Sequence, residues 1–166
     1  MQKTPEPTLD AERIWAILDE IKDPEIPVVS VVEMGMIRSF GITDDKVIVT
    51  MTPTFIGCPA IQVMKDAIED HLLHAGVSRV EVNITHSPPW TTERITTAAR
   101  QKLKDFGLSP PPRHSGDLEI ALEAPVACPY CDSRDTGLKN SFGPTLCRAI
   151  YVCNACQQPF EQFKPV

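Results

Sequence analysis

The chain has 166 residues, of which 42% are hydrophobic and 23% are charged, and its formal net charge is −6. This length suits one domain of ordinary size, or a domain of about 100 residues with a small appendage. A net negative charge argues against nucleic acid as the main partner, because nucleic-acid-binding proteins usually have a basic face and a high pI. No apolar run approaches the roughly 20 residues of a membrane span, and the N-terminus has no apolar signal core. We therefore expect a cytoplasmic protein with no membrane partner.

The first 107 residues alternate between helical and strand patterns. Asp10 is placed to cap an amphipathic helix that stops before Asp23-Pro24. Hydrophobic periodicity then predicts strands over 28–42 and 46–52, a helix over 59–76, a strand over 77–85 and a helix over 91–107. The order αββαβα indicates an α+β domain, in which a small mixed sheet is covered by helices on one side.

The pattern fails over residues 108–125, where three consecutive prolines and a Ser-Gly pair are typical of an extended linker. Within this segment only LEIAL (118–122) has the composition of a short strand or a docking segment. Beyond it, residues 126–166 are rich in cysteine. The expected organisation is a domain over 1–107, a Pro-rich linker over 108–125 and a small module over 126–166.

Five of the six cysteines lie in the last 39 residues. Cys128 and Cys131 form one CxxC pair, Cys153 and Cys156 form another, and 21 residues separate the pairs. Two such turns aim four sulfurs at one ion, and a hairpin with a turn at Gly143-Pro144 bridges the gap between them. The spacing predicts a zinc-ribbon-like β module whose folding depends on its metal.

The spacing alone leaves the identity of the metal open. A structural zinc is the first choice for four cysteines, and an iron-sulfur cluster is the alternative, because four thiolates also bind that cofactor. Cys147 exceeds the four ligands that either group needs. It shares strand parity with Tyr151 and Cys153, which predicts a buried small apolar side chain, with a spare metal ligand as the alternative.

Cys58 stands alone, between Gly57 and Pro59. Pro59 is typical of the first position of a helix, so Cys58 is the apparent N-cap, where peptide N–H groups favour a thiolate. Local chemistry leaves a reactive thiol and an inert half-buried cysteine equally open. The remaining polar candidates are His71, His74, His86, His114, Asp23, Glu25 and Glu33. They carry no recognisable catalytic arrangement, so we predict no catalytic residue, and we expect turn-forming and exposed roles for Asp23, Glu25 and Glu33.

Three blocks in this order resemble the SufT-like iron-sulfur assembly domain: DPEIPVVSVVEMGMIRSF (23–40), VTMTPTFIGCPAIQVMKDAI (49–68) and SPPWTTERITTAAR (87–100). With the cysteine-rich tail attached, the chain is similar to one branch of that family, the PaaD (PaaJ) proteins of bacterial phenylacetate degradation. In related domains the cysteine of the second block is the functional thiol, which here falls on Cys58.

The resemblance implies an accessory role beside a multicomponent phenylacetyl-CoA 1,2-epoxidase, whose reductase carries flavin and an iron-sulfur cluster. The implied function is a maturation factor that helps to deliver iron or a transient iron-sulfur cluster, above all to the reductase. Such a protein would work through Cys58, with a second copy of the chain as a further expected partner in a homodimer. The alternative is a non-catalytic, zinc-binding adaptor of the oxygenase complex.

Overall fold

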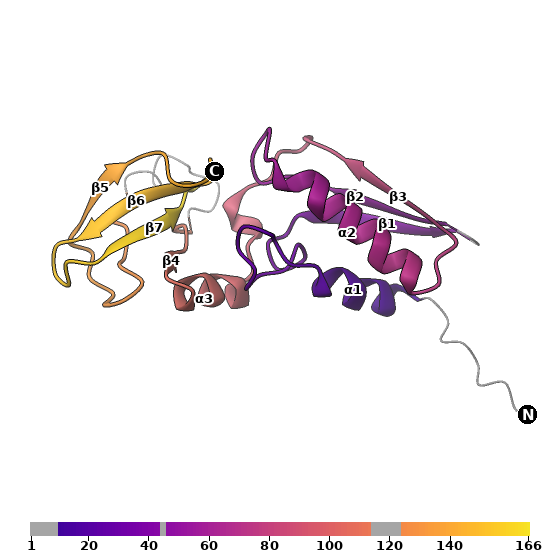
Figure 1. The fold of residues 1–166 in the computed structure, drawn as a ribbon, viewed down its shortest axis with the longest axis horizontal. Helices are drawn as coiled ribbons and strands as arrows, with labels where there is room; N and C mark the ends of the chain where they lie inside the picture. The colour runs from indigo at the N-terminus through magenta and orange to yellow at the C-terminus, as the bar shows by residue number, and fades with distance from the viewer. Residues whose placement is uncertain (1–9, 44–45, 114–123) are drawn as a thin grey trace, which may run out of the picture.

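The structure is a computed structural model that describes residues 10–43, 46–113 and 124–166. Its elements are α1 (Ala11–Glu20), β1 (Ile37–Thr43), β2 (Lys46–Met51), α2 (Ala60–His74), β3 (Arg79–Ile84), the 3-10 helix η1 (Thr92–Arg94), α3 (Thr97–Asp105), β4 (Leu108–Ser109), β5 (Thr136–Asn140), β6 (Arg148–Cys153) and β7 (Pro159–Phe163). They form two sheets toward opposite ends of an elongated molecule (Figure 1). The predicted α+β class is confirmed. Over the described residues, every helix is too short or too polar to cross a membrane.

The first sheet is mixed, because β2 pairs antiparallel with β1 and parallel with β3. Along β2, buried residues alternate with partly exposed ones, the buried set being Val47, Val49 and Met51. Leu18 of α1 and Ile68 of α2 join these residues in one core. A single face of the sheet is therefore covered by helices, as the periodicity predicts.

The start of the first strand was predicted wrongly. β1 begins at Ile37, whereas residues 28–36 form consecutive turns. The N–H of Met34 donates to the carbonyl of Ser30 (2.9 Å), and that of Gly35 donates to Val32 (2.8 Å). Gly35 has φ +65°, a conformation that glycine adopts without strain. Residues 28–36 are apolar because this loop packs into the core. Apolar composition alone does not distinguish a buried loop from a buried strand.

The predicted helix over 91–107 is divided in two. η1 ends at Arg94, Ile95 has extended backbone, and Thr96 then caps α3 by accepting a hydrogen bond from the N–H of Ala99 (3.1 Å). Threonine is a favoured N-cap because its hydroxyl satisfies a free N–H of the first turn. The spacing of apolar residues nevertheless continues across the break: Ile95 and Leu103 are both buried in the same core.

The second sheet has the order β4-β7-β6-β5. The predicted hairpin is present as the antiparallel pair β5 and β6, with Gly143-Pro144 in the connecting loop. β7 also pairs with β6, and β4 pairs in parallel with β7. Residues 108–109 of the expected linker are therefore a strand of this sheet. The LEIAL strand, predicted over 118–122, lies outside the described residues.

The ribbon and the first unit share a core. Phe163 of β7 is 1% exposed, and its ring centroid lies 6.0 Å from that of Trp90. The N–H of Thr92 donates to the carbonyl oxygen of Val166 (2.9 Å), and Ser109 Oγ donates to the carbonyl of Ala127 (2.8 Å). These contacts fix the ribbon against the loops at one end of the first sheet.

Candidate functional site

Two knuckles with the same backbone pattern present the ribbon cysteines. The N–H of Cys128 donates to Ser133 (2.9 Å), and that of Asp132 donates back to Cys128 (3.0 Å). The second knuckle repeats these bonds 25 residues later: Cys153 donates to Gln158 (3.0 Å) and Gln157 donates to Cys153 (3.0 Å). Asp132 and Gln157 both have φ 61°. Each CxxC turn therefore reverses the chain direction in the same way and points both of its sulfurs toward the four-cysteine cluster.

The four sulfurs of Cys128, Cys131, Cys153 and Cys156 lie within 4.8 Å of one another. Cys128 Sγ is 3.7 Å from Cys156 Sγ, and Cys131 Sγ is 3.6 Å from Cys153 Sγ. A tetrahedral zinc ion with Zn–S bonds of about 2.3 Å separates its sulfurs by about 3.8 Å. The donor set and its spacing therefore fit a closed four-cysteine zinc site, and all four residues are those that the spacing indicates.

The four thiols of the cluster share their protons unequally. The N–H of Cys156 donates to Cys153 Sγ (3.5 Å), and this bond is the largest of several effects that lower the pKa of Cys153 to about 7, whereas the pKa of Cys131 is raised to about 12 and that of Cys156 is also raised. Thiolates are the form of cysteine that binds metal, so a lowered pKa reduces the cost of releasing the proton.

Cys58 lies in the loop between β2 and α2, and the prediction that it caps the helix is wrong. Pro59 occupies the cap position, and Gly57 before the thiol has φ +77°. Burial raises the pKa of Cys58, and the charges of Asp23 and Cys147 raise it further. The N–H groups at the start of α2 oppose the shift and are outweighed. The helix end therefore does not produce a resting thiolate.

The same loop places Cys58 in a cavity that also receives Asp23 and Cys147. The cavity has a volume of about 30 Å³, which accommodates an ion or one water molecule. Asp23 is 8% exposed, and its Oδ1 accepts the N–H groups of Glu25 (2.8 Å) and Ile26 (3.1 Å). The predicted turn-forming role of Asp23 is confirmed, whereas its expected exposure is wrong.

Cys147 is partly buried and packs against the main core. It is separate from the four-cysteine cluster, is half-buried rather than buried, and lines the same cavity as Cys58. Burial raises the pKa of Cys147, and Asp23 contributes in the same direction. Sequence reasoning did not relate Cys147 to Cys58, because 89 positions separate them and only tertiary packing brings them together.

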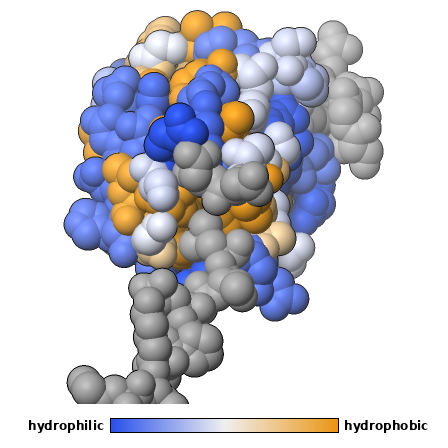
Figure 2. Space-filling model, turned by 90° about the vertical axis from the view of Figure 1, so that its right-hand side faces the viewer, coloured by the Kyte–Doolittle hydropathy of each residue, from blue (hydrophilic) through white to orange (hydrophobic). Residues whose placement is uncertain are grey.

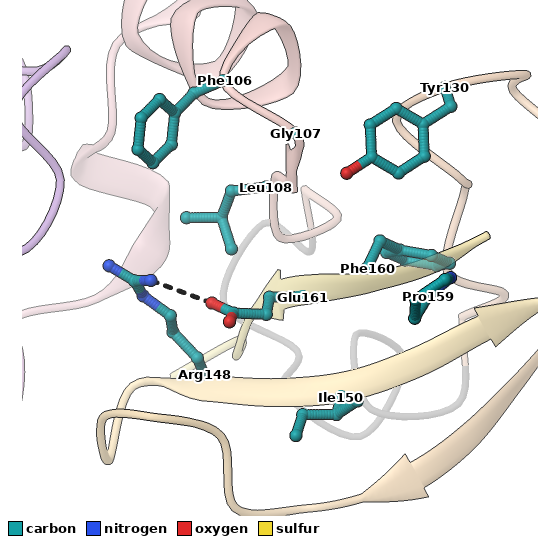
Figure 3. Close-up of a pocket in the computed structure, with 9 residues that line it drawn as sticks. All are labelled: Phe106, Gly107, Leu108, Tyr130, Arg148, Ile150, Pro159, Phe160 and Glu161. Atoms are coloured by element: carbon teal, nitrogen blue, oxygen red, sulfur yellow. Dashed lines mark hydrogen bonds and ion pairs between the residues drawn. The ribbon is translucent and has the colours of Figure 1, made fainter.

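Arg148, next to Cys147, was also missed by sequence reasoning. Its guanidinium donates to Glu161 (2.8 Å) and to the backbone carbonyl of Glu25. Figure 3 shows the pair of Arg148 and Glu161 beside a cleft of about 390 Å³ between the end of α3 and the ribbon. Because Arg148 bonds to the Asp23 loop, it holds the segment of Cys147 against the first unit.

The other polar candidates lie elsewhere. His71 and His74 are exposed on α2, and the Nδ1 atom of each bonds to the helix backbone. His86 lines a cavity with Thr52 and Trp90 rather than the one with Cys58. A further candidate, Glu33, accepts Lys102 of α3 in an ion pair (2.6 Å), and His114 lies outside the described residues.

Family models match both parts of the chain. Residues 11–84 match the model described as iron-sulfur cluster assembly protein, and residues 113–164 match the PaaD zinc beta ribbon domain. A conserved hypothetical protein from Thermotoga maritima, of known structure, is 31% identical, with a TM-score of 0.50 over 62% of this chain and 98% of that one. Fold and cysteine cluster thus define an iron-sulfur assembly domain joined to a zinc ribbon.

Two curated relatives narrow the assignment. A protein of Escherichia coli (strain K12), provisionally named as one of the subunits of 1,2-phenylacetyl-CoA epoxidase, is 40% identical over 151 residues, which are 91% of this chain and 90% of that protein. The chain belongs to the family of this epoxidase protein. The Fe-S protein maturation auxiliary factor YitW of Bacillus subtilis (strain 168) is 31% identical over 55% of this chain and 91% of its own length.

Proposed function

We propose that the protein is a maturation factor for a phenylacetyl-CoA epoxidase, and that it delivers iron or an iron-sulfur cluster to the reductase of that system. The observation that carries the proposal is the position of Cys58 in an assembly domain, in a loop whose cavity is also lined by Asp23 and Cys147. The name of the E. coli relative supports the epoxidase as the client, and that of the B. subtilis relative supports maturation as the role.

In this proposal the two parts of the chain have different tasks. The ribbon holds a structural zinc through Cys128, Cys131, Cys153 and Cys156, which supplies the cross-link that a module of this size needs. Zinc has no redox chemistry, so this ion fixes the ribbon and takes no part in electron transfer. The thiol of Cys58 exchanges its proton for iron when the cargo binds, and it releases the iron to the client.

The test replaces Cys58 by serine in cells that make the epoxidase and its reductase. We expect reduced epoxidase activity and a reductase that lacks iron and sulfide, because the oxygen of serine is a weak ligand for iron. The matched control is Ile56→Ala, which changes a side chain of the same loop that is 83% exposed and has no ligand atom.

The same experiment separates this function from that of a zinc-binding adaptor. An adaptor orders its partners through its surface, so Cys58→Ser would leave both the activity and the reductase cluster intact. Loss of activity in ribbon variants alone, with Cys58→Ser unchanged, would contradict the maturation role and support the adaptor.

A further inference from the structure

Three segments that are distant in sequence converge on the cavity of Cys58. Asp23 comes from the loop after α1, Cys58 from the loop before α2, and Cys147 from the ribbon loop before β6. The first two belong to the assembly domain, and the third belongs to the ribbon. The cavity therefore exists only because the ribbon packs on the assembly domain.

The ribbon side of the cavity is held by several bonds. The Thr145 hydroxyl lies in hydrogen-bond contact with Cys147 Sγ (3.1 Å), and the N–H of Lys164 donates to the Cys147 carbonyl (2.9 Å). Arg148 ties the next residue to the Glu25 carbonyl. Arg148 lines the neighbouring cleft and not this cavity, but its guanidinium is close enough to lower the pKa of both Asp23 and Cys147, so it offsets part of the negative charge of the site.

The chemistry of the three groups favours a cation. Two sulfurs and one carboxylate all become negative when they lose their protons. Burial is the main effect that opposes this loss in all three groups, and the negative charge of Asp23 adds repulsion at both thiols. A divalent ion removes the repulsion and takes the place of the protons, which pass to water. Thiolates with one carboxylate suit borderline first-row metals such as iron, cobalt and zinc.

We propose that Cys58, Cys147 and Asp23 form a second metal site, which takes one divalent first-row transition-metal ion and whose second thiol is supplied by the ribbon. The inference rests on the proposed function, for which it identifies the place where iron is held. It also gives the ribbon a direct part in the handling of the cargo, besides its own zinc.

The second site differs from the ribbon cluster in being open. Among the described residues, only the ribbon cysteines have three or more ligand atoms within 4.8 Å of one another. The side chains of the cavity must therefore turn toward an ion to bind it. A preformed site holds its metal tightly. A site that must close around its metal spends part of the binding free energy on ordering its side chains, so it binds more weakly and can release the ion, as a carrier must.

The test uses the full chain with zinc in the ribbon, titrated with cobalt(II) without oxygen. Thiolate-to-cobalt absorption reports sulfur ligands, and zinc measured in the same sample shows whether cobalt has displaced it. We expect about one cobalt ion per chain beyond the zinc. Cys147→Ser, Cys58→Ser and Asp23→Asn should each weaken its binding by about tenfold or more. The control Leu146→Ala, which changes the same cavity wall without removing a ligand, should bind as the unaltered chain does.

Each variant is compared by thermal unfolding and zinc content, and Cys147→Ala provides a second replacement if serine disturbs the fold. The inference is overturned if the zinc-loaded chain binds no further cobalt, or if both Cys147 variants bind it with unaltered affinity and absorption. Those results leave the proposed function standing if Cys58→Ser still lowers the cluster content of the reductase. They therefore separate the failure of the composite site from the failure of the function.

Discussion

The surroundings of the Cys58 thiol keep it in its neutral form. Burial is the largest effect that raises its pKa, and the neighbouring Asp23 and Cys147 add to it. The N–H groups of Ala60 and Ile61 lower the pKa but do not compensate. A neutral thiol reacts slowly with electrophiles, yet it still binds a metal ion that displaces its proton. This environment therefore suits metal binding better than nucleophilic catalysis.

The raised pKa predicts a slow, pH-dependent alkylation of Cys58. In zinc-loaded protein, the rate with iodoacetamide should rise with pH through and above the ordinary range of a cysteine, because the thiolate is the reactive form. Asp23→Asn removes a negative charge that raises the pKa of Cys58, so the reaction at neutral pH should be a few-fold faster. Mass spectrometry of the Cys58 peptide measures both rates.

Asparagine keeps the Oδ1 acceptor that the N–H groups of Glu25 and Ile26 require, so Asp23→Asn preserves the turn. Glu33→Gln serves as the control, because its carboxylate pairs with Lys102 on α3 and does not line this cavity. An unchanged or slower alkylation in Asp23→Asn would show that the charge of Asp23 does not act on Cys58.

Individual site residues were predictable to the extent that local spacing determines them. Two CxxC pairs at a fixed separation identify all four ribbon ligands, because each turn aims its own sulfurs. The protonation of Cys58 was not predictable, because it depends on burial and on the charges of Cys147 and Asp23. Both lie in other segments, and no local pattern relates them.

At the scale of elements, the ribbon strands depend on the two knuckles. Cys131→Ser removes the exposed ligand with the least effect on packing, and it should lower zinc retention during chelator treatment. β5 and β6 should then lose their hydrogen-exchange protection, since the knuckles join their ends. Zinc analysis and hydrogen exchange measure the two effects.

Leu138→Ala is the control for the ribbon, because this side chain lies on β5 of the same module, is 54% exposed and has no ligand atom. Its zinc content should equal that of the unaltered chain. Zinc loss in Leu138→Ala as great as in Cys131→Ser would contradict the assignment of the four ligands.

Elements with a clear period were predicted well. α1, β2, α2 and β3 all lie where apolar residues repeat with one period between turn signals. The segment 28–36 was predicted wrongly, because a buried loop and a buried strand have the same apolar composition. β7 was missed because pairing with β6, rather than its own composition, makes it a strand.

At the scale of the molecule, the ribbon and the assembly domain are joined through their interior. The buried ring of Phe163 belongs to the main core, together with Trp90 and Leu108. The opposite end carries separate hydrophobic areas among hydrophilic surface (Figure 2). A homodimer through any part of this surface stays a prediction, as do the domain boundaries at 107 and 125.

This joint predicts that the two units unfold together. Phe163→Ala should lower the free energy of unfolding by about 3–5 kcal/mol, because it removes a buried aromatic side chain. It should also separate two transitions that coincide in the unaltered chain: tryptophan fluorescence, which reports Trp15 and Trp90 of the first unit, and zinc release, which reports the ribbon. Denaturant titration followed by both signals measures the effect.

Phe142→Ala is the control for this substitution, because Phe142 is 65% exposed and contacts the ammonium group of Lys164 at the surface. It should change the free energy of unfolding by less than about 1 kcal/mol. Coincident transitions in Phe163→Ala, with little loss of stability, would show that the units are not joined through this core.

The ratio of cluster iron to flavin in the reductase tests the maturation role most directly. Flavin counts reductase molecules, so the ratio reports cluster insertion without depending on epoxidase activity. In reductase purified from cells with Cys58→Ser, we predict a ratio far below that from cells with the unaltered chain or with Ile56→Ala. Equal ratios in all three would contradict the role of Cys58 in iron delivery.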